Sequence, residues 1–142
     1  MKKLLFAITA VIISLACSAD DRPIDPGRLP NAVKTFISTY FPESTVSYAQ
    51  EDDDRFRPDY TVILSSGVKI EFSHDGSMEK IESRAGIPEE LIPVQIREYV
   101  QRQYPDAVYV EYEIDRHYYE IGLSNKIELR FNRNFNLVEV DY

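Results

Sequence analysis

The chain contains one pattern twice, and this self-similarity constrains its fold more than any other feature of the sequence. The segment LPNAVKTFISTYFP (residues 29–42) aligns with IPVQIREYVQRQYP (residues 92–105) at an offset of 63. In both segments apolar residues recur at i, i+3, i+4 and i+8 and a proline follows, which predicts one amphipathic helix in each copy. The apolar positions are Val33, Phe36, Ile37 and Phe41 in the first copy and Ile96, Tyr99, Val100 and Tyr104 in the second.

The segments after the helices also align. YTVILSSGVKIEFSHDGSMEKIES (residues 60–83) matches YEIGLSNKIELRFNRNFNLVEVDY (residues 119–142) at an offset of 59. Their apolar residues alternate with polar ones, which predicts strands with one buried face, and we expect Phe72 and Phe131 to pack beneath the helix residues Phe36 and Tyr99. Further strands are expected near residues 46–51 and 108–114. The tight turns are expected at residues that tolerate φ > 0, namely Ser66-Gly67, Asp75-Gly76, Asn125 and Asn134.

These patterns predict an α+β fold of two tandem repeats. Each repeat is expected to be a helix followed by a four-stranded antiparallel β-meander, with the helices packed on one face of the sheet. We expect the two repeats to pack as one domain, because a unit of about 55 residues buries little surface alone. The predicted organisation is a signal peptide (1–19), an N-terminal leader (20–28), repeat 1 (29–83), a linker (84–90) and repeat 2 (91–142).

The first residues, MKKLLFAITAVIISLACSAD, have the order of a secretory signal peptide: two lysines, an uncharged stretch, then small residues. The uncharged stretch is shorter than the roughly 20 residues that span a bilayer. Cleavage after Ala19 would give a periplasmic or secreted chain that starts at Asp20. Alternatively, SLAC resembles a lipobox, although Ser14 replaces the preferred leucine, and Cys17 would then carry the lipid of an outer-membrane lipoprotein. The sequence leaves both open.

The net negative charge of the chain restricts the kinds of partner that it can bind. Cleavage after Ala19 removes Lys2 and Lys3, which leaves 14 basic and 24 acidic residues and a net charge of −10. No cluster of Lys and Arg offers the basic face that a nucleic acid requires. We therefore expect another protein as the partner, no nucleic acid, and contact with a membrane only if Cys17 is lipidated. The acidity serves solubility or attracts a basic surface.

The sequence carries no complete catalytic or cofactor signature. An Asp52 start for a calcium loop would put Arg57 at the sixth position, where that loop needs glycine. The two histidines, His74 and His117, lie far apart and outside any zinc motif. We therefore predict that the protein is not an enzyme, and we expect no cofactor and no metal site.

The start ADDRPI, the helix LP...FI..YFP and the meander Y.V.LSSGVKIEF, together with the export signal, resemble the PepSY-like, β-lactamase-inhibitor-protein-like (BLIP-like) family of secreted bacterial proteins. The resemblance implies two helix-plus-four-strand repeats. It also implies a binding function, since the inhibitor that gives the family its name holds its target enzyme with the open face of its sheet and with loops. No contact residue of that inhibitor matches a position here, so inhibition of a β-lactamase is not implied.

Two turns are the predicted contact sites. EDDDRFRPDY (residues 51–60) and IDRHYY (residues 114–119) each place an Asp-Arg pair before a ring, as contact loops on rigid scaffolds often do. The candidate partner-binding residues are Asp53, Asp54, Arg55, Phe56, Asp115, Arg116, His117 and Tyr118. The alternative is that these charged turns only keep the sheet edge soluble.

The sheet face opposite the helices is a second candidate surface, expected to carry Thr61, Ile63, Lys69, Glu71, Glu120, Glu128 and Arg130. The predicted function is a secreted or periplasmic non-catalytic binding module, with inhibition of an extracytoplasmic enzyme as one form of it. The alternative is an envelope-anchored structural lipoprotein.

Overall fold

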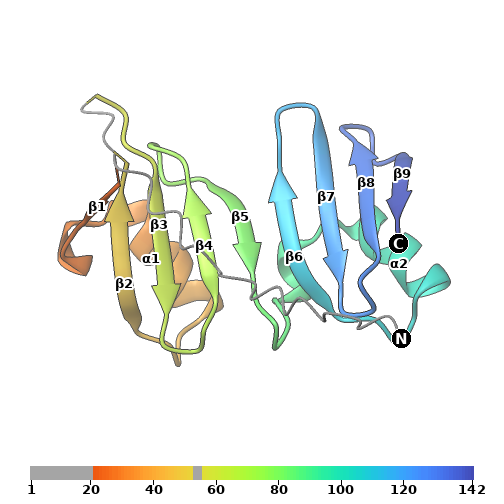
Figure 1. The fold of residues 1–142 in the computed structure, drawn as a ribbon, viewed down its shortest axis with the longest axis horizontal. Coiled ribbons are helices and arrows are strands. Elements are labelled where there is room, and N and C mark those ends of the chain that lie inside the picture. Colours follow the sequence, from red (N-terminus) through yellow and green to blue (C-terminus); the bar gives the residue numbers. More distant parts are fainter. Residues whose placement is uncertain (1–20, 53–55) are drawn as a thin grey trace, which may run out of the picture.

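Nine strands form one antiparallel sheet in the computed structural model, and they follow one another across the sheet in sequence order (Figure 1). The structure describes residues 21–52 and 56–142. The predicted signal peptide with Cys17, and the candidates Asp53, Asp54 and Arg55, lie outside the described residues. The strands are β1 (Arg22–Pro23), β2 (Val46–Glu51), β3 (Tyr60–Leu64), β4 (Lys69–Phe72), β5 (Met78–Glu82), β6 (Tyr109–Ile114), β7 (Tyr118–Leu123), β8 (Glu128–Asn132) and β9 (Leu137–Asp141).

Two α-helices lie behind the same face of this sheet in Figure 1, α1 (Asn31–Tyr40) and α2 (Val94–Gln103). Short 3₁₀ helices precede them, η1 (Pro26–Arg28) and η2 (Glu89–Leu91). Each α-helix starts directly after a proline, whose missing N–H costs nothing at a helix start. Within the described part of the chain, neither helix has the length and apolarity needed to cross a membrane.

A row of helix-side residues runs through the core from β2 to β9. The strand register joins Ala49, Val62, Ile70, Ile81, Tyr112, Ile121, Leu129 and Val140 as successive neighbours. All of them except Val140 are buried. The row passes from β5 to β6 through the pair Ile81 and Tyr112, so the core does not stop in the middle of the sheet.

The predicted division into two tandem helix-plus-four-strand repeats is wrong. The structure is one nine-stranded sheet with two helices, in which three register pairs, including Ile81 with Tyr112, join β5 to β6. The predicted leader supplies β1, which pairs with β2 at the edge of the sheet. Two separate meanders would leave the facing edges of β5 and β6 without backbone partners, and their pairing removes those edges.

Aromatic side chains fix each helix to the sheet, as expected from the sequence. The ring of Phe36 on α1 meets Phe72 on β4 edge to face, at 5.3 Å between ring centroids and 83° between planes. On α2, Tyr99 meets Phe131 of β8 in the same way, at 5.5 Å and 81°. Phe72 and Phe131 are both completely or almost completely buried. These contacts confirm the predicted packing of the two pairs.

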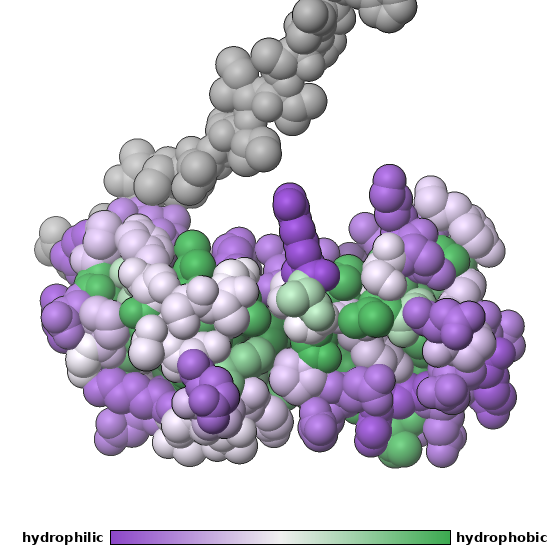
Figure 2. All heavy atoms as spheres, turned by 90° about the horizontal axis from the view of Figure 1, so that it is seen from below, coloured by the Kyte–Doolittle hydropathy of each residue, from purple (hydrophilic) through white to green (hydrophobic). Residues whose placement is uncertain are grey.

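The strands alternate in direction, so the turns β2–β3, β4–β5, β6–β7 and β8–β9 all lie at the same end of the strands. This end is uppermost in Figure 1 and is here called the upper edge. The opposite edge carries the turns β3–β4 and β7–β8 and the connection from β5 to α2. Figure 2 shows this lower edge, where hydrophobic side chains reach the surface in small patches separated by hydrophilic ones. The β6–β7 turn and the described residues of the β2–β3 connection therefore lie on the same, upper edge.

Candidate binding surface

Two rows of charged side chains cross the face of the sheet opposite the helices, here called the open face. The strand register places Glu71, Lys80, Glu113, Glu120, Arg130 and Glu139 in the first row. The second row contains Lys69, Glu82, Glu111, Gly122, Glu128 and Asp141. Eight carboxylates and three cations give these rows a formal charge of −5. The open face is therefore acidic, and its three cations lie among the carboxylates.

Lys80 holds the acids at the junction of β5 and β6. Its Nζ lies 2.7 Å from Glu111 Oε1, 3.1 Å from Glu82 Oε1 and 3.6 Å from Glu113 Oε2. Partial burial works to lower the pKa of the Lys80 ammonium, but the hydrogen bonds to Glu111 and Glu82 outweigh it and raise the pKa. Lys80 is therefore charged at any physiological pH and links two strands.

Arg130 links carboxylates of β7 and β9 in the same way. Its guanidinium donates to Glu120 Oε2 from Nε at 3.1 Å and from Nη2 at 2.8 Å, and it also pairs with Glu139. The same group lies 4.8 Å from the centroid of the Tyr118 ring. The nearby Glu113 carboxylate, followed by burial, raises the pKa of the Tyr118 phenol. Tyr118 is thus a neutral hydroxyl at the border of an acidic surface.

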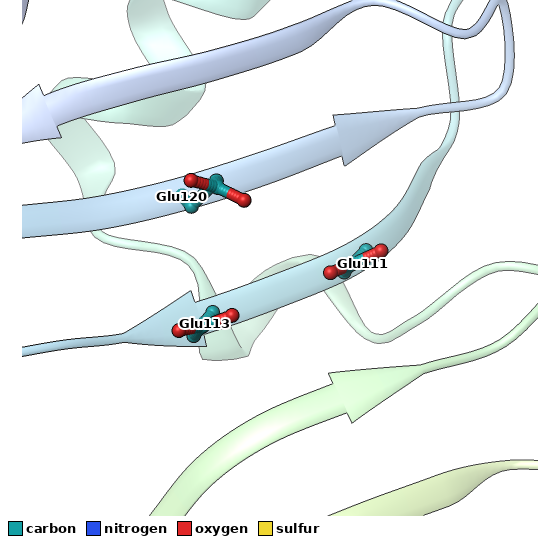
Figure 3. Close-up of side chains that lie close together, drawn as sticks. All are labelled: Glu111, Glu113 and Glu120. Atoms are coloured by element: carbon teal, nitrogen blue, oxygen red, sulfur yellow. The ribbon is translucent and has the colours of Figure 1, made fainter.

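Glu111, Glu113 and Glu120 form a group of three neighbouring carboxylates on the open face (Figure 3). One oxygen from each lies within 4.8 Å of the others. Gly122 leaves room for this group, because a Cβ at that position would come within 2.9 Å of the Glu111 Cβ. A calcium ion takes six to eight oxygen ligands. Glu111 and Glu120 already accept hydrogen bonds from Lys80 and Arg130, and Glu113 forms an ion pair with Lys80, so this group does not fit that requirement.

A polar depression of about 710 Å³ connects the open face to the β6–β7 turn. Its walls include Lys80, Glu113 and the turn residues Asp115, Arg116 and His117. The Asp115 Oδ1 atom accepts from the backbone N–H of His117 at 2.8 Å, and the Asp115 N–H donates to the Tyr118 carbonyl at 2.9 Å. These two bonds hold the turn in shape and leave the Arg116 and His117 side chains exposed.

The structure brings together one of the two predicted groups of contact residues. Asp115, Arg116, His117 and Tyr118 lie side by side where the open face meets the upper edge. Phe56, with 94% of its surface exposed, belongs to the β2–β3 connection at the same edge. The β4–β5 hairpin separates the two turns in the strand order.

Sequence reasoning missed the centre of the open face. All seven candidates for this face lie on it, namely Thr61, Ile63, Lys69, Glu71, Glu120, Glu128 and Arg130. Missed were Lys80, Glu82, Glu111, Glu113, Glu139 and Asp141. The same alternation marks them, but only the pairing of β5 with β6 shows that they adjoin.

A protein-family model described as "Putative beta-lactamase-inhibitor-like, PepSY-like" matches residues 58–139. A solved structure of a putative periplasmic protein of the DUF2874 family from Bacteroides vulgatus is 36% identical, with 88% of this chain and 99% of that chain covered and a TM-score of 0.82. A putative calcium-regulated periplasmic protein from Bacteroides thetaiotaomicron is also 36% identical, with 86% and 97% covered and a TM-score of 0.81.

A further putative periplasmic protein of unknown function from Bacteroides vulgatus is 27% identical, with 86% of this chain and 99% of that chain covered and a TM-score of 0.80. No curated protein matches the chain. The similar solved structures thus share almost the whole fold and a periplasmic description.

Proposed function

Because the chain belongs to the PepSY-like family, we propose that it is a periplasmic, non-catalytic module that binds a basic surface of another protein with its open face. The observation that carries the proposal is the acidic open face, with a formal charge of −5 in its two rows. An acidic surface attracts basic partners during diffusion and repels acidic ones, so it favours specificity and rapid association.

The open face also suits binding because its side chains are held in place before a partner arrives. Lys80 and Arg130 each bridge carboxylates from neighbouring strands. Side chains that are already ordered lose less conformational entropy on binding. The exposed Phe56 and Arg116 at the adjoining edge are residue types that often anchor an interface.

Inhibition of an extracytoplasmic enzyme is the specific form of this function that the family description suggests. A rigid acidic sheet can cover the entrance of an enzyme whose active-site rim is basic. The turn residues Arg116 and His117 would then reach past the rim, since they project from the end of the sheet. Measuring the activity of a captured enzyme with and without the purified protein decides whether binding inhibits it.

A photo-crosslinking experiment tests the surface. A crosslinking amino acid replaces Thr61, which is the register partner of Glu71 on the open face, or Thr35, which is exposed on α1. In periplasmic extract the Thr61 probe should capture a protein that the Thr35 probe does not. Adding Glu113→Lys to the Thr61 variant should reduce that adduct, and so should raised salt. Equal capture by both probes would contradict the proposal.

The calcium-regulated relative raises the question of calcium in this chain. We propose no calcium-dependent role here, because Lys80 and Arg130 occupy the positions next to the Glu111, Glu113 and Glu120 carboxylates. An ion would have to displace one of these cations and find further ligands outside the group.

A further inference from the structure

A second surface lies on the helix side of the sheet, away from the open face. A groove with a volume of about 400 Å³ runs along α2, and its lining includes the helix residues Val94, Arg97 and Val100. Tyr104, which follows the helix, Ala107, and Tyr109 at the start of β6 also line the groove, as do the charged residues Glu89, Glu98 and Arg102. The size falls in the range of small-molecule sites, which is about 300 to 1,000 Å³.

Arg97 has an unusual environment in this groove. Its Nε atom is the one buried side-chain nitrogen or oxygen without a hydrogen-bond partner in the part of the chain that the structure describes. Its guanidinium also forms no ion pair with a described residue. Buried polar groups in folded proteins are almost always paired. Arg97 is only partly buried and lines the groove, so an acceptor that enters the groove would pair with its guanidinium.

The other side chains that line the groove indicate what kind of molecule would carry this acceptor. Val94 has half of its surface exposed although it is apolar, while Val100 and Tyr109 are buried at the base. Burial, followed by the charge of Glu89, raises the pKa of the Tyr109 phenol, which therefore remains a neutral hydroxyl. The groove thus combines an apolar wall with the unpaired Arg97 and a second cation, Arg102.

The geometry points to a ligand class: we infer that this groove binds a monocarboxylate with an apolar body. The planar fork of N–H groups on Arg97 matches a carboxylate, and the apolar body would cover Val94 and Ala107. Two arginines, Arg97 and Arg102, and two glutamates, Glu89 and Glu98, line the groove, so a single negative charge leaves less charge uncompensated than a doubly charged phosphate would. The carboxylate can come from a free aliphatic acid or from the C-terminus of a peptide.

Titrations followed by ¹H–¹⁵N NMR test this inference on the purified protein. The probes are decanoate, the neutral decanol, and a short peptide ending in leucine as either the free acid or the amide. Decanoate or the free-acid peptide should shift the resonances of α2 and residues 104–109, and the matching neutral probe should bind at least tenfold more weakly. Whichever acid binds identifies the source of the carboxylate.

Two substitutions and a matched control complete the test. Arg97→Met should weaken the acid at least tenfold, whereas Lys34→Met, at the aligned position on α1, should leave the affinity unchanged. Without ligand, Arg97→Met should be at least as stable as the parent, because it removes an unpaired buried donor. Ala107→Trp should block the groove while keeping Arg97.

The inference is overturned by any of three results. These are equal affinity of the parent and Arg97→Met, equal binding of the acid and its neutral counterpart, or no shifts at α2 with either acid. Because the open face and this groove lie on opposite faces of the sheet, none of these results bears on the proposed protein-binding function.

Discussion

Truncation of Phe72 to alanine tests whether the nine strands unfold as one unit. Phe72 is completely buried, and its ring packs edge to face with that of Phe36, at 5.3 Å between the ring centroids. Removing a buried phenylalanine ring costs about 3 to 5 kcal/mol, against the roughly 5 to 15 kcal/mol that stabilises a whole domain. At about 4 °C per kcal/mol for a chain of this size, the melting temperature should fall by roughly 10 to 20 °C.

Phe131→Ala should have the same effect from the other half of the sheet, since Phe131 is 1% exposed and meets Tyr99 at 5.5 Å. Urea unfolding can be followed by far-ultraviolet circular dichroism and by tyrosine fluorescence, because the chain has ten tyrosines and no tryptophan. Both variants should show one transition in which the two signals coincide. Phe56→Ala is the control, since Phe56 is 94% exposed and its loss should change stability by no more than about 0.5 kcal/mol.

Two transitions, of which Phe72→Ala moves only one, would refute this reasoning. The three register pairs between β5 and β6 and the contact of Ile81 with Tyr112 would then be too weak to couple the halves. The turns β2–β3 and β6–β7 would also lose their fixed relation, and with it the reason to expect that they bind one partner together.

Three further predictions concern single side chains. Hydrogen bonds from the Ser73 hydroxyl and from Ser77 lower the pKa of Asp75 from 3.8 to about 2, so Asp75 should stabilise the fold above about pH 4 and lose this contribution as the pH falls toward 2. Urea unfolding should accordingly show Asp75→Asn as less stable than the parent at pH 6, with most of this difference lost at pH 2; a constant difference would contradict this. Lys80→Ala should lower stability by about 1 to 3 kcal/mol, and millimolar calcium should raise the melting temperature of this variant more than that of the parent, in which the ammonium excludes the ion. If the chain is cleaved after Ala19, a palmitate analogue should not label it and its mature mass should start at Asp20, whereas label on Cys17 would establish the anchored form.

The sequence predicted where the tight turns lie, but not always which residue in the turn has a positive φ angle. Gly76 has a φ of 84°, as expected for a residue without a Cβ. In the aligned part of the chain Asn125 and Asn134 lie in the turns as predicted, but the positive φ angles belong to the residues that follow them, Lys126 and Phe135, at 69° and 62°. The Asn125 side chain accepts a backbone N–H in the turn instead, so the following residue takes the left-handed conformation.

The positions of the helices and strands followed from periodicity, because a buried stripe leaves a local mark in the sequence. No comparable pattern in the sequence shows that the two halves join into one nine-stranded sheet. Whether Ile81 pairs across to Tyr112 depends on backbone hydrogen bonds that any residue except proline can form. For the same reason Lys80 was not among the residues predicted for the open face, although its neighbours on β6 make it the centre of an ion-pair network.

The distribution of cations on the open face indicates where a basic group of a partner would bind. Lys80 balances the acids at the junction of β5 and β6, and Arg130 balances those of the first row on β7 and β9. Glu128 and Asp141 are register partners at the end of the second row, and neither has an ion-pair partner among the residues that the structure describes. Like charges that face each other across strands repel, so a partner lysine or arginine between them would relieve repulsion and make new ion pairs. The β8–β9 end of the open face is therefore where a basic contact gains most.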